Sequence, residues 1–366
     1  MAKVTLQSVA DAVGVSRMTV SNAFSRPQKL SADLRARIMA VAEEMGYIGP
    51  DPAARALARG RTGTVGLLIT GRMSEVSRDA VATEFMVAVA DRLADHDLAL
   101  TLLSAGLGVD REGDHDAVVP SRDVPMDGAL VYVCEVDSAD LAWLQKRRLP
   151  LVTVDQEPLD GFPAVNVDDH FGAAAAAQHL VDLGHRRVGL LSLEPIGPAD
   201  RFQSPAADRF AGWREALEAA GIEPTVALAD YQDLEAIRAA AVGLLSADPR
   251  PTGILCFSDV LAVQAIRAAE SLGLTVPDDV SVVGFDDSSL AVSVRPTLTT
   301  VSQPVSRKGE LAVEELIALM ATVRERADEQ PGSKGAAAPT PTADEPARTV
   351  LPTALVVRDS TAPPPQ

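Results

Sequence analysis

The chain has 366 residues, a formal net charge of −18 and 47% hydrophobic residues, which makes it too long for one typical domain and apolar enough to fill two or three cores. No apolar run reaches the roughly 18 residues needed to span a bilayer, and the first 25 residues hold no signal-peptide core, so we expect a cytoplasmic protein without a membrane segment. Cys134 and Cys256 lie in apolar runs and are expected to be reduced core residues.

The charge is divided unevenly along the chain. Residues 1–61 contain nine Lys and Arg against five Asp and Glu, a net charge of +4, while the remaining 305 residues carry a net charge of −22. A basic head on an acidic body indicates that any polyanion binds at the N-terminus. A chance fluctuation in a short segment would give the same charge, so the pattern of residues is needed to decide between this explanation and a polyanion-binding head.

Three short helices are predicted in the basic head. Thr5 can cap the first, whose apolar residues follow a 3.6-residue spacing up to a turn at Gly14. Ser16 can cap a second helix that ends at Phe24, and Ser31 can cap a third. Two short helices joined by a tight glycine turn and braced by a third make a helix-turn-helix unit, although any three-helix bundle shows the same periodicity.

The segment PDPAARALARG, residues 50–60, follows the head. Asp51 can cap and Pro52 can open a short helix through Leu57, but so short a helix is marginal in water and needs a partner to persist. DNA can supply that partner, and a plain proline-rich linker is the alternative.

The rest of the chain alternates apolar strands with amphipathic helices. Runs such as TVGLLIT (64–70), RVGLLSL (187–193) and VSVVGFD (280–286) are too apolar for sheets with one exposed face, so we expect parallel sheets with helices on both faces. Ligands bind beyond the carboxyl ends of such strands, here in a cleft between two lobes. From about residue 322 to 347 the chain is rich in Pro, Ala, Gly and charge, which predicts a disordered surface loop before a last strand, TVLPTALVV.

Catalytic motifs are missing from the sequence. There is no Gly-x-Ser-x-Gly elbow and no Walker-type loop, and Arg111 stands where a dinucleotide fingerprint starting at Gly106 would need glycine. The five histidines show no metal-ligand spacing with the cysteines. We therefore expect no enzyme, no cofactor and no metal site. A cytoplasmic solute-binding protein with no DNA role is the alternative interpretation of the body.

Three stretches carry a resemblance to a known family: VTLQSVADAVGVSRMTVSNAF (4–24), LSADLRARIMAVAEEMGYIG (30–49) and RPTLTTVSQPVSRKGELAVEEL (295–316). They closely resemble LacI/GalR-type bacterial transcription regulators. The resemblance implies an α/β fold class with an N-terminal three-helix helix-turn-helix head and a hinge helix, followed by a two-lobed, periplasmic-binding-protein-like body with parallel sheets. The expected bounds are 1–49 for the head, 50–61 for the hinge and 62–366 for the body, with lobe 1 at about 62–163 and 292–321 and lobe 2 at about 164–291 and 348–360.

The resemblance implies that the second helix of the head lies in the major groove of DNA. Arg17 can then contact guanine, Asn22 adenine, and Met18 a thymine methyl group, unless Arg17 and Met18 belong to an ordinary solvated face. Hydroxyl side chains suit phosphates, and in the hinge a leucine wedges into a minor-groove step. The expected DNA-binding residues are Thr5, Ser16, Arg17, Met18, Thr19, Ser21, Asn22, Arg55 and Leu57.

The same resemblance aligns five residues of the body with effector-contacting positions: Asp155, Arg209, Tyr231, Ser258 and Asp286. Carboxylates can accept hydrogen bonds from sugar hydroxyls, arginine can hold a polar ring substituent, and tyrosine can stack on an apolar sugar face. The expected effector is small and polar, a sugar or a nucleoside-like compound.

The resemblance also implies a homodimer, because two recognition helices related by a twofold axis match the half-sites of a near-palindromic operator. The subunit contact is expected at VSRKGELAVEELIAL (305–319) and at the first-lobe helix near Phe85. Closure of the cleft on the effector would change the spacing of the paired hinge segments and hence the affinity for DNA. The expected function is a ligand-responsive, sequence-specific transcriptional regulator, and we expect a repressor.

Overall fold

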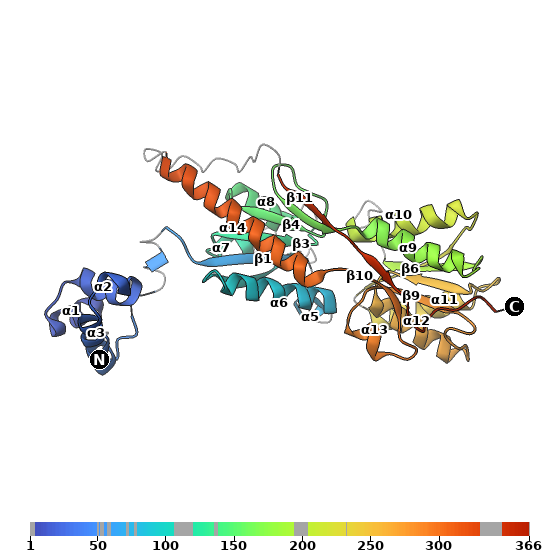
Figure 1. The fold of residues 1–366 in the computed structure, drawn as a ribbon, viewed down its shortest axis with the longest axis horizontal. Helices are drawn as coiled ribbons and strands as arrows, with labels where there is room; N and C mark the ends of the chain where they lie inside the picture. The colour runs from blue at the N-terminus through green and yellow to red at the C-terminus, as the bar shows by residue number, and fades with distance from the viewer. Residues whose placement is uncertain are drawn as a thin grey trace, which may run out of the picture. The chain divides into compact units, whose positions relative to one another are not determined.

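The chain folds into two units, Met1–Gly63 and Thr64–Gln366, which we call the head and the body (Figure 1). The computed structural model describes residues 4–49, 51, 55–56, 60–70, 73–76, 79–105, 120–134, 138–193, 204–231, 233–329 and 346–365. Among these residues no helix is both long and apolar enough to cross a membrane. Cys134 and Cys256 are buried and form no disulfide.

The head contains α1 (Leu6–Val13), α2 (Arg17–Ser25), the short 3-10 helix η1 (Pro27–Lys29) and α3 (Ala32–Glu44). The three predicted caps form: the hydroxyls of Thr5, Ser16 and Ser31 accept hydrogen bonds from backbone N–H groups of the first turns of α1, α2 and α3. Gly14 ends α1 in the left-handed conformation, with φ of 77°. The α-helices enclose a small core of Val9, Ala10, Val13, Val20, Ala23, Ile38 and Ala42.

Lobe 1 of the body is built on a six-stranded sheet in the order β11-β5-β4-β3-β1-β2, in which all neighbouring strands are parallel. Helices α6 and α14 cover one face, where Phe85 and Leu316 are fully buried, and α8 covers the other with Leu141. The elements of lobe 1 are β1 (Thr64–Thr70), α5 (Met73–Val76), α6 (Ala80–Ala94), β2 (Ala99–Ala105), α7 (Pro120–Asp123), β3 (Gly128–Tyr132), α8 (Ala139–Lys146), β4 (Leu151–Val154), β5 (Ala164–Val167), α14 (Val305–Glu329) and β11 (Arg348–Leu351).

Lobe 2 is built on a second six-stranded sheet, in the order β12-β10-β9-β8-β6-β7, which is parallel except for the antiparallel pair β10 and β12. Helices α11 and α12 pack on one face, and α9 and α10, with the buried Trp213, pack on the other. The elements of lobe 2 are α9 (Asp169–Asp182), β6 (Val188–Leu193), α10 (Ser204–Ala219), β7 (Thr225–Ala229), α11 (Leu234–Leu245), β8 (Gly253–Cys256), α12 (Asp259–Ser271), β9 (Ser281–Asp286), α13 (Ser289–Ser293), β10 (Thr299–Ser302) and β12 (Ala354–Val356).

The crossings between the lobes differ from the predicted bounds. Residues 164–167 were expected in lobe 2 but form β5, which pairs with β4 and β11 of lobe 1. Residues 299–302 were expected in lobe 1 but form β10, which pairs with β9 of lobe 2. Each strand pairs with the strand that precedes it in the chain, so both crossings come later in the sequence than predicted.

The predicted last strand and the predicted disordered loop also need correction. TVLPTALVV is divided between β11 in lobe 1 and β12 in lobe 2, because Pro352 lacks an N–H for the ladder and Thr353 instead donates its hydroxyl to the Asp168 carbonyl at 2.8 Å. Helix α14 continues to Glu329, eight residues into the expected loop, since residues 322–329 contain good helix formers and neither Gly nor Pro. The rest of that loop, residues 330–345, lies outside the described residues.

Candidate effector site and DNA-binding surface

The five residues predicted to contact an effector lie at one end of the strands or on α10. Asp155 directly follows β4, Asp286 ends β9, Ser258 follows β8, and Tyr231 follows β7. These are the carboxyl ends of parallel strands, where ligands bind in open α/β sheets. Asp155 and Asp286 have positive φ angles of 50° and 111°, a conformation that is strained for a residue with a side chain and is found at functional sites.

Arg209 contacts two carboxylates, a backbone carbonyl and two aromatic rings. Its Nε donates to Asp169 Oδ1 at 2.7 Å, and its Nη1 donates to the Phe257 carbonyl at 2.6 Å and lies 3.4 Å from Asp286 Oδ1. The guanidinium carbon is 3.6 Å from the ring centroid of Phe285 and 4.6 Å from that of Phe257. The guanidinium is thus buried among two carboxylates and two aromatic rings, and its orientation is fixed.

The two carboxylates around Arg209 are themselves perturbed. Burial raises the pKa of Asp169 to about 6, although the charge of Arg209 acts in the opposite direction. Burial also raises the pKa of Asp286 well above its usual range, and the neighbouring Asp259 and Asp79 add to this effect. Gln303 partly compensates, because its Nε2 donates to Asp286 Oδ1 at 2.7 Å.

A second buried cation, Lys308 on α14, lies on the lobe 1 side of the site. Its Nζ donates to Asp155 Oδ2 and, at 2.9 Å, to Gln303 Oε1. Because Gln303 also binds Asp286, these three residues are linked through Asp286 to Arg209. One chain of polar contacts runs from β4 and α14 of lobe 1 to β9 and α10 of lobe 2.

The lobes also meet at Tyr231. Its hydroxyl interacts with Ser258 and with the carboxylate of Asp79, and its ring lies edge-on to Phe257 with centroids 6.3 Å apart. Asp79 caps α6 of lobe 1, accepting from the backbone of Val81 at 2.8 Å, and burial raises its pKa. Ser258 acts as the cap of α12. Tyr231 thus links lobe 2 to the start of α6.

In the head, α2 presents the predicted recognition residues. Arg17 and Met18 are exposed, Met18 to 69%, while Ser21 and Asn22 are half-buried. The hydroxyls of Ser16 and Thr19 hydrogen-bond to each other at 2.8 Å, in addition to the capping bond of Ser16. Thr5 is exposed at the start of α1, where its hydroxyl is paired with that of Ser8.

Of the predicted hinge, the structure describes only Asp51, Arg55, Ala56 and Gly60 within residues 50–60. Arg55 and Ala56 are helical, and the Arg55 N–H donates to the Asp51 carbonyl at 2.9 Å. The predicted wedge residue Leu57 lies outside the described residues.

Both the head and the body match known protein families. Residues 5–49 match the family described as bacterial regulatory proteins, lacI family, and residues 177–361 match the periplasmic binding protein-like domain. The chain is also 37% identical over 330 residues to the HTH-type transcriptional regulator Rv3575c of Mycobacterium tuberculosis, covering 86% of this chain and 90% of that protein. The chain belongs to the LacI family of bacterial regulatory proteins. This LacI-family protein is a DNA-binding transcriptional regulator, and the interpretation as a solute-binding protein without a DNA role is disfavoured.

Two further comparisons extend along this LacI-family chain. It is 32% identical over 329 residues to the HTH-type transcriptional repressor PurR of Proteus mirabilis, covering 88% of this chain and 92% of that protein. The solved structure of a transcriptional regulator CelR–cellobiose complex superposes with a TM-score of 0.65 at 26% identity, covering 98% of this chain and all of that one.

Several residues of the site in this LacI-family chain were not predicted: Asp79, Asp169, Gln303 and Lys308. A signal was available for Lys308, which occupies an apolar position of α14, three residues after Val305 and four before Ala312. Asp79 and Asp169 look like ordinary residues at helix starts, and Gln303 lies in a crossing between lobes. Only the folded chain brings these three to the predicted residues.

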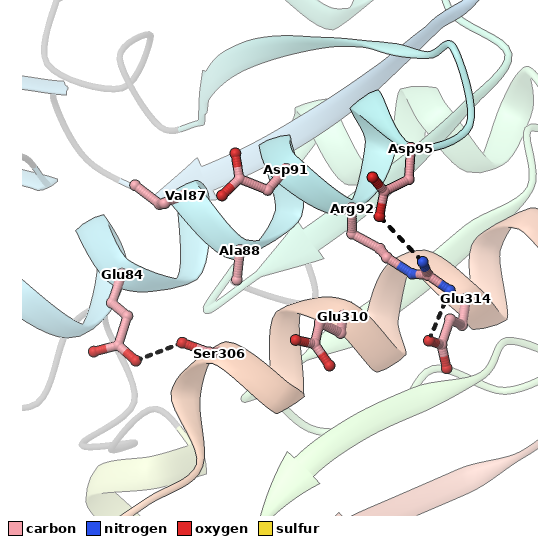
Figure 2. Close-up of a pocket in the computed structure, with 9 residues that line it drawn as sticks. All are labelled: Glu84, Val87, Ala88, Asp91, Arg92, Asp95, Ser306, Glu310 and Glu314. Atoms are coloured by element: carbon pink, nitrogen blue, oxygen red, sulfur yellow. Dashed lines mark hydrogen bonds and ion pairs between the residues drawn. The ribbon is translucent and has the colours of Figure 1, made fainter.

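The LacI-family body also has a surface pocket of about 540 Å³ between α6 and α14 (Figure 2), and none of the five predicted effector residues lines it. Arg92 on α6 bridges the pocket to Glu314 on α14 at 3.1 Å and also pairs with Asp95 at 3.2 Å. The remaining side chains are largely acidic; the lining consists of Glu84, Val87, Ala88, Asp91, Arg92, Asp95, Ser306, Glu310 and Glu314. Gly309 lies beside this pocket, and a Cβ there would approach the Ala88 Cβ to 2.9 Å, so α6 and α14 are closely packed.

Proposed function

We propose that this LacI-family regulator is a homodimeric repressor that acts in the cytoplasm and binds a near-palindromic operator with α2 of each subunit. The observation that carries the proposal is the exposed face of α2, where Arg17 and Met18 project from a helix fixed by its cap and core. In the major groove Arg17 can fork onto guanine O6 and N7, Asn22 can pair with adenine, and Met18 can touch a thymine methyl group. Thr5, Ser16, Thr19, Ser21 and Arg55 contact the phosphate backbone, and Leu57 enters a minor-groove step.

The dimer contact in this proposal involves α6 and α14, which form one continuous face of lobe 1 with the half-exposed Val87 beside their acidic pocket. Twofold symmetry would place two heads on two half-sites. Effector binding between the lobes would alter the spacing of the two hinge segments and thereby the affinity for the operator.

The effector in this proposal is a small polar compound, most simply a sugar, held by Asp155, Arg209, Tyr231, Ser258 and Asp286. Support comes from the carboxylates of Asp155 and Asp286 at the strand ends, whose side chains are largely buried and can accept hydrogen bonds from hydroxyls, and from the cellobiose complex of a structural relative.

Operator binding tests the first part of the proposal. We expect Arg17→Ala and Asn22→Ala each to reduce the preference for the operator over random DNA about 5- to 150-fold, because each removes a base contact worth about 1–3 kcal/mol of discrimination. Arg35→Ala, which removes an exposed arginine from α3, is the matched control and should weaken both DNAs about equally. The operator is first selected from a random duplex library with the full-length protein, and fluorescence anisotropy then gives both affinities. An unchanged preference in both α2 variants would show that this helix does not read the bases.

A further inference from the structure

Lys308 is a fully buried cation that the proposed set of effector residues does not include. It lies on the apolar side of α14, among the buried Val305, Ala312 and Leu316, with its Nζ 6.0 Å from the centre of the Tyr132 ring. A lysine removed from water persists in the charged form only when it is paired and hydrogen-bonded. Its partners are the Asp155 carboxylate and the Gln303 side chain, both of which are more than nine-tenths buried.

Within the part of the chain that the structure describes, Asp155 uses only one of its two carboxylate oxygens. Oδ2 accepts from Lys308, whereas Oδ1 is buried and accepts no hydrogen bond from any of the residues that the structure describes. A buried carboxylate oxygen without a donor is unfavourable and is rare in folded proteins. The strained φ of Asp155 indicates that its surroundings hold this geometry. Asp155 Oδ1 can therefore accept a hydrogen bond from a ligand that binds between the lobes.

The charges around this oxygen limit what the donor can be. Four buried carboxylates, those of Asp79, Asp155, Asp169 and Asp286, surround the polar chain, against the two cations Arg209 and Lys308. Both cations are already paired with these carboxylates, so a phosphate or carboxylate on the effector would find repulsion and no uncommitted cation among them. Asp155, Asp169 and Asp286 are already paired with these cations, and Asp79 accepts hydrogen bonds from the first turn of α6, so an amine would have to compete with groups that are already bound. Hydroxyl groups donate hydrogen bonds without adding charge.

We propose that Lys308 is a positioning residue of the effector site and that the effector is an uncharged polyhydroxyl compound. Lys308 holds Asp155 by Oδ2 and so directs Oδ1 toward an effector hydroxyl. Through Gln303 it also fixes Asp286, which would accept a second hydroxyl. This inference rests on the proposed function, since it assumes that the effector binds at Asp155 and Asp286.

Titration calorimetry on the full-length protein tests the effector class with matched compounds. The panel contains D-ribose, D-glucose, cellobiose and a set of other pentoses, hexoses, disaccharides and cyclitols, together with ribose 5-phosphate, glucose 6-phosphate and glucosamine. We expect at least one uncharged compound to bind, and its phosphate ester and amine counterparts to bind at least about 10-fold more weakly, which corresponds to about 1.4 kcal/mol. An ester or amine that binds as tightly as its parent, or the lack of any uncharged ligand at about 10 mM, would overturn the assignment.

Three variants then test Lys308 with the uncharged compound that binds best. Lys308→Met alone leaves Asp155 buried and unpaired, so the double variant Lys308→Met/Asp155→Asn, which removes both charges with little change in volume, is made beside it. We expect the double variant to keep the melting temperature of the wild type within a few degrees and to bind at least about 10-fold more weakly than Asp155→Asn alone, because Lys308 also holds Asp286 through Gln303. Lys146→Met, on the exposed end of α8, is the matched control and should bind like the wild type.

The outcomes separate this inference from the proposed function. If the double variant folds and binds the compound as tightly as Asp155→Asn alone, Lys308 has only a structural role and the inference is wrong. If instead the wild type binds the compound but operator affinity does not respond to it, the proposed ligand-responsive function fails while the assignment of the site stands.

Discussion

Replacing Arg209 by alanine is expected to destabilise lobe 2 strongly, as well as to impair effector binding. The variant would leave the buried carboxylates of Asp169 and Asp286 without their cation and would empty the space between two aromatic rings. Breaking a buried ion pair by removing one partner costs about 3–5 kcal/mol, because the remaining charge stays buried. That is a large part of the roughly 5–15 kcal/mol typical for the stability of a folded protein.

The two tryptophans of the chain make the measurement specific. Trp143 lies on α8 of lobe 1 and Trp213 on α10 of lobe 2, one helical turn after Arg209, and the head contains none. Urea unfolding of the full-length protein followed by tryptophan fluorescence therefore reports on the body alone. We expect the free energy of unfolding of Arg209→Ala to fall by about 3–5 kcal/mol.

Arg238→Ala is the matched control for this measurement. Arg238 pairs with Glu235 one turn earlier on α11, and both side chains are exposed. Exposed pairs of this kind contribute about 0–1 kcal/mol, so the control should stay within that range of the wild type. If the two variants lost similar amounts of stability, the burial of the Arg209 cluster would not have the energetic consequence assigned to it here.

Two further predictions concern α9. The pKa of Asp169 is about 6 in the folded state, against 3.8 for an unperturbed aspartate, so the folded state binds the proton of this carboxyl more tightly than the unfolded state. Ionisation of Asp169 therefore lowers the free energy of unfolding by about 3 kcal/mol as the pH rises from below 4 to above 6. Urea titrations at pH 4 and pH 7 give the difference in free energy of unfolding between Asp169→Asn and the wild type. This difference should shift in favour of the variant at pH 7, and a difference that does not change with pH would contradict the raised pKa of Asp169. Gly212→Ala would place a Cβ 2.3 Å from the His170 carbonyl oxygen and should destabilise the body by about 1–3 kcal/mol in thermal unfolding. Gly243→Ala, whose Cβ would have no atom within 4 Å, should instead be neutral or stabilise by up to about 1 kcal/mol, and equal effects of the two alanines would refute the packing argument.

Elements that depend on neighbours in sequence were predictable. The caps at Thr5, Ser16 and Ser31 act on N–H groups three residues away, and the inner strands are unbroken apolar runs. The edge strand β7 has a largely exposed surface and gives no such signal. The assignment of β5 and β10 to their lobes failed for another reason: an apolar run indicates a strand but does not show that this strand pairs with the one before it.

Only the placement of site residues at the strand ends was predictable from the sequence. Asp155 and Asp286 follow recognisable strands, and the geometry of parallel sheets brings strand ends together. The ion pairs of the site were not predictable, because Asp169 lies 40 residues from Arg209 in the sequence, and Lys308 lies 153 residues from Asp155. A lysine in the apolar stripe of α14 indicates a buried partner but does not identify it.

The contacts between the lobes bear directly on how an effector could control DNA binding. Tyr231 with Asp79, and Gln303 with Lys308 and Asp286, join the lobes through hydrogen bonds to charged groups, each worth about 1.5–3 kcal/mol. An effector whose hydroxyls bind Asp155 or Asp286 must add to these contacts or replace them. Coupling of about 1–3 kcal/mol between two sites changes affinity by about 5- to 150-fold. The gain or loss of a single inter-lobe contact is therefore large enough to account for regulation, without any rearrangement inside either lobe.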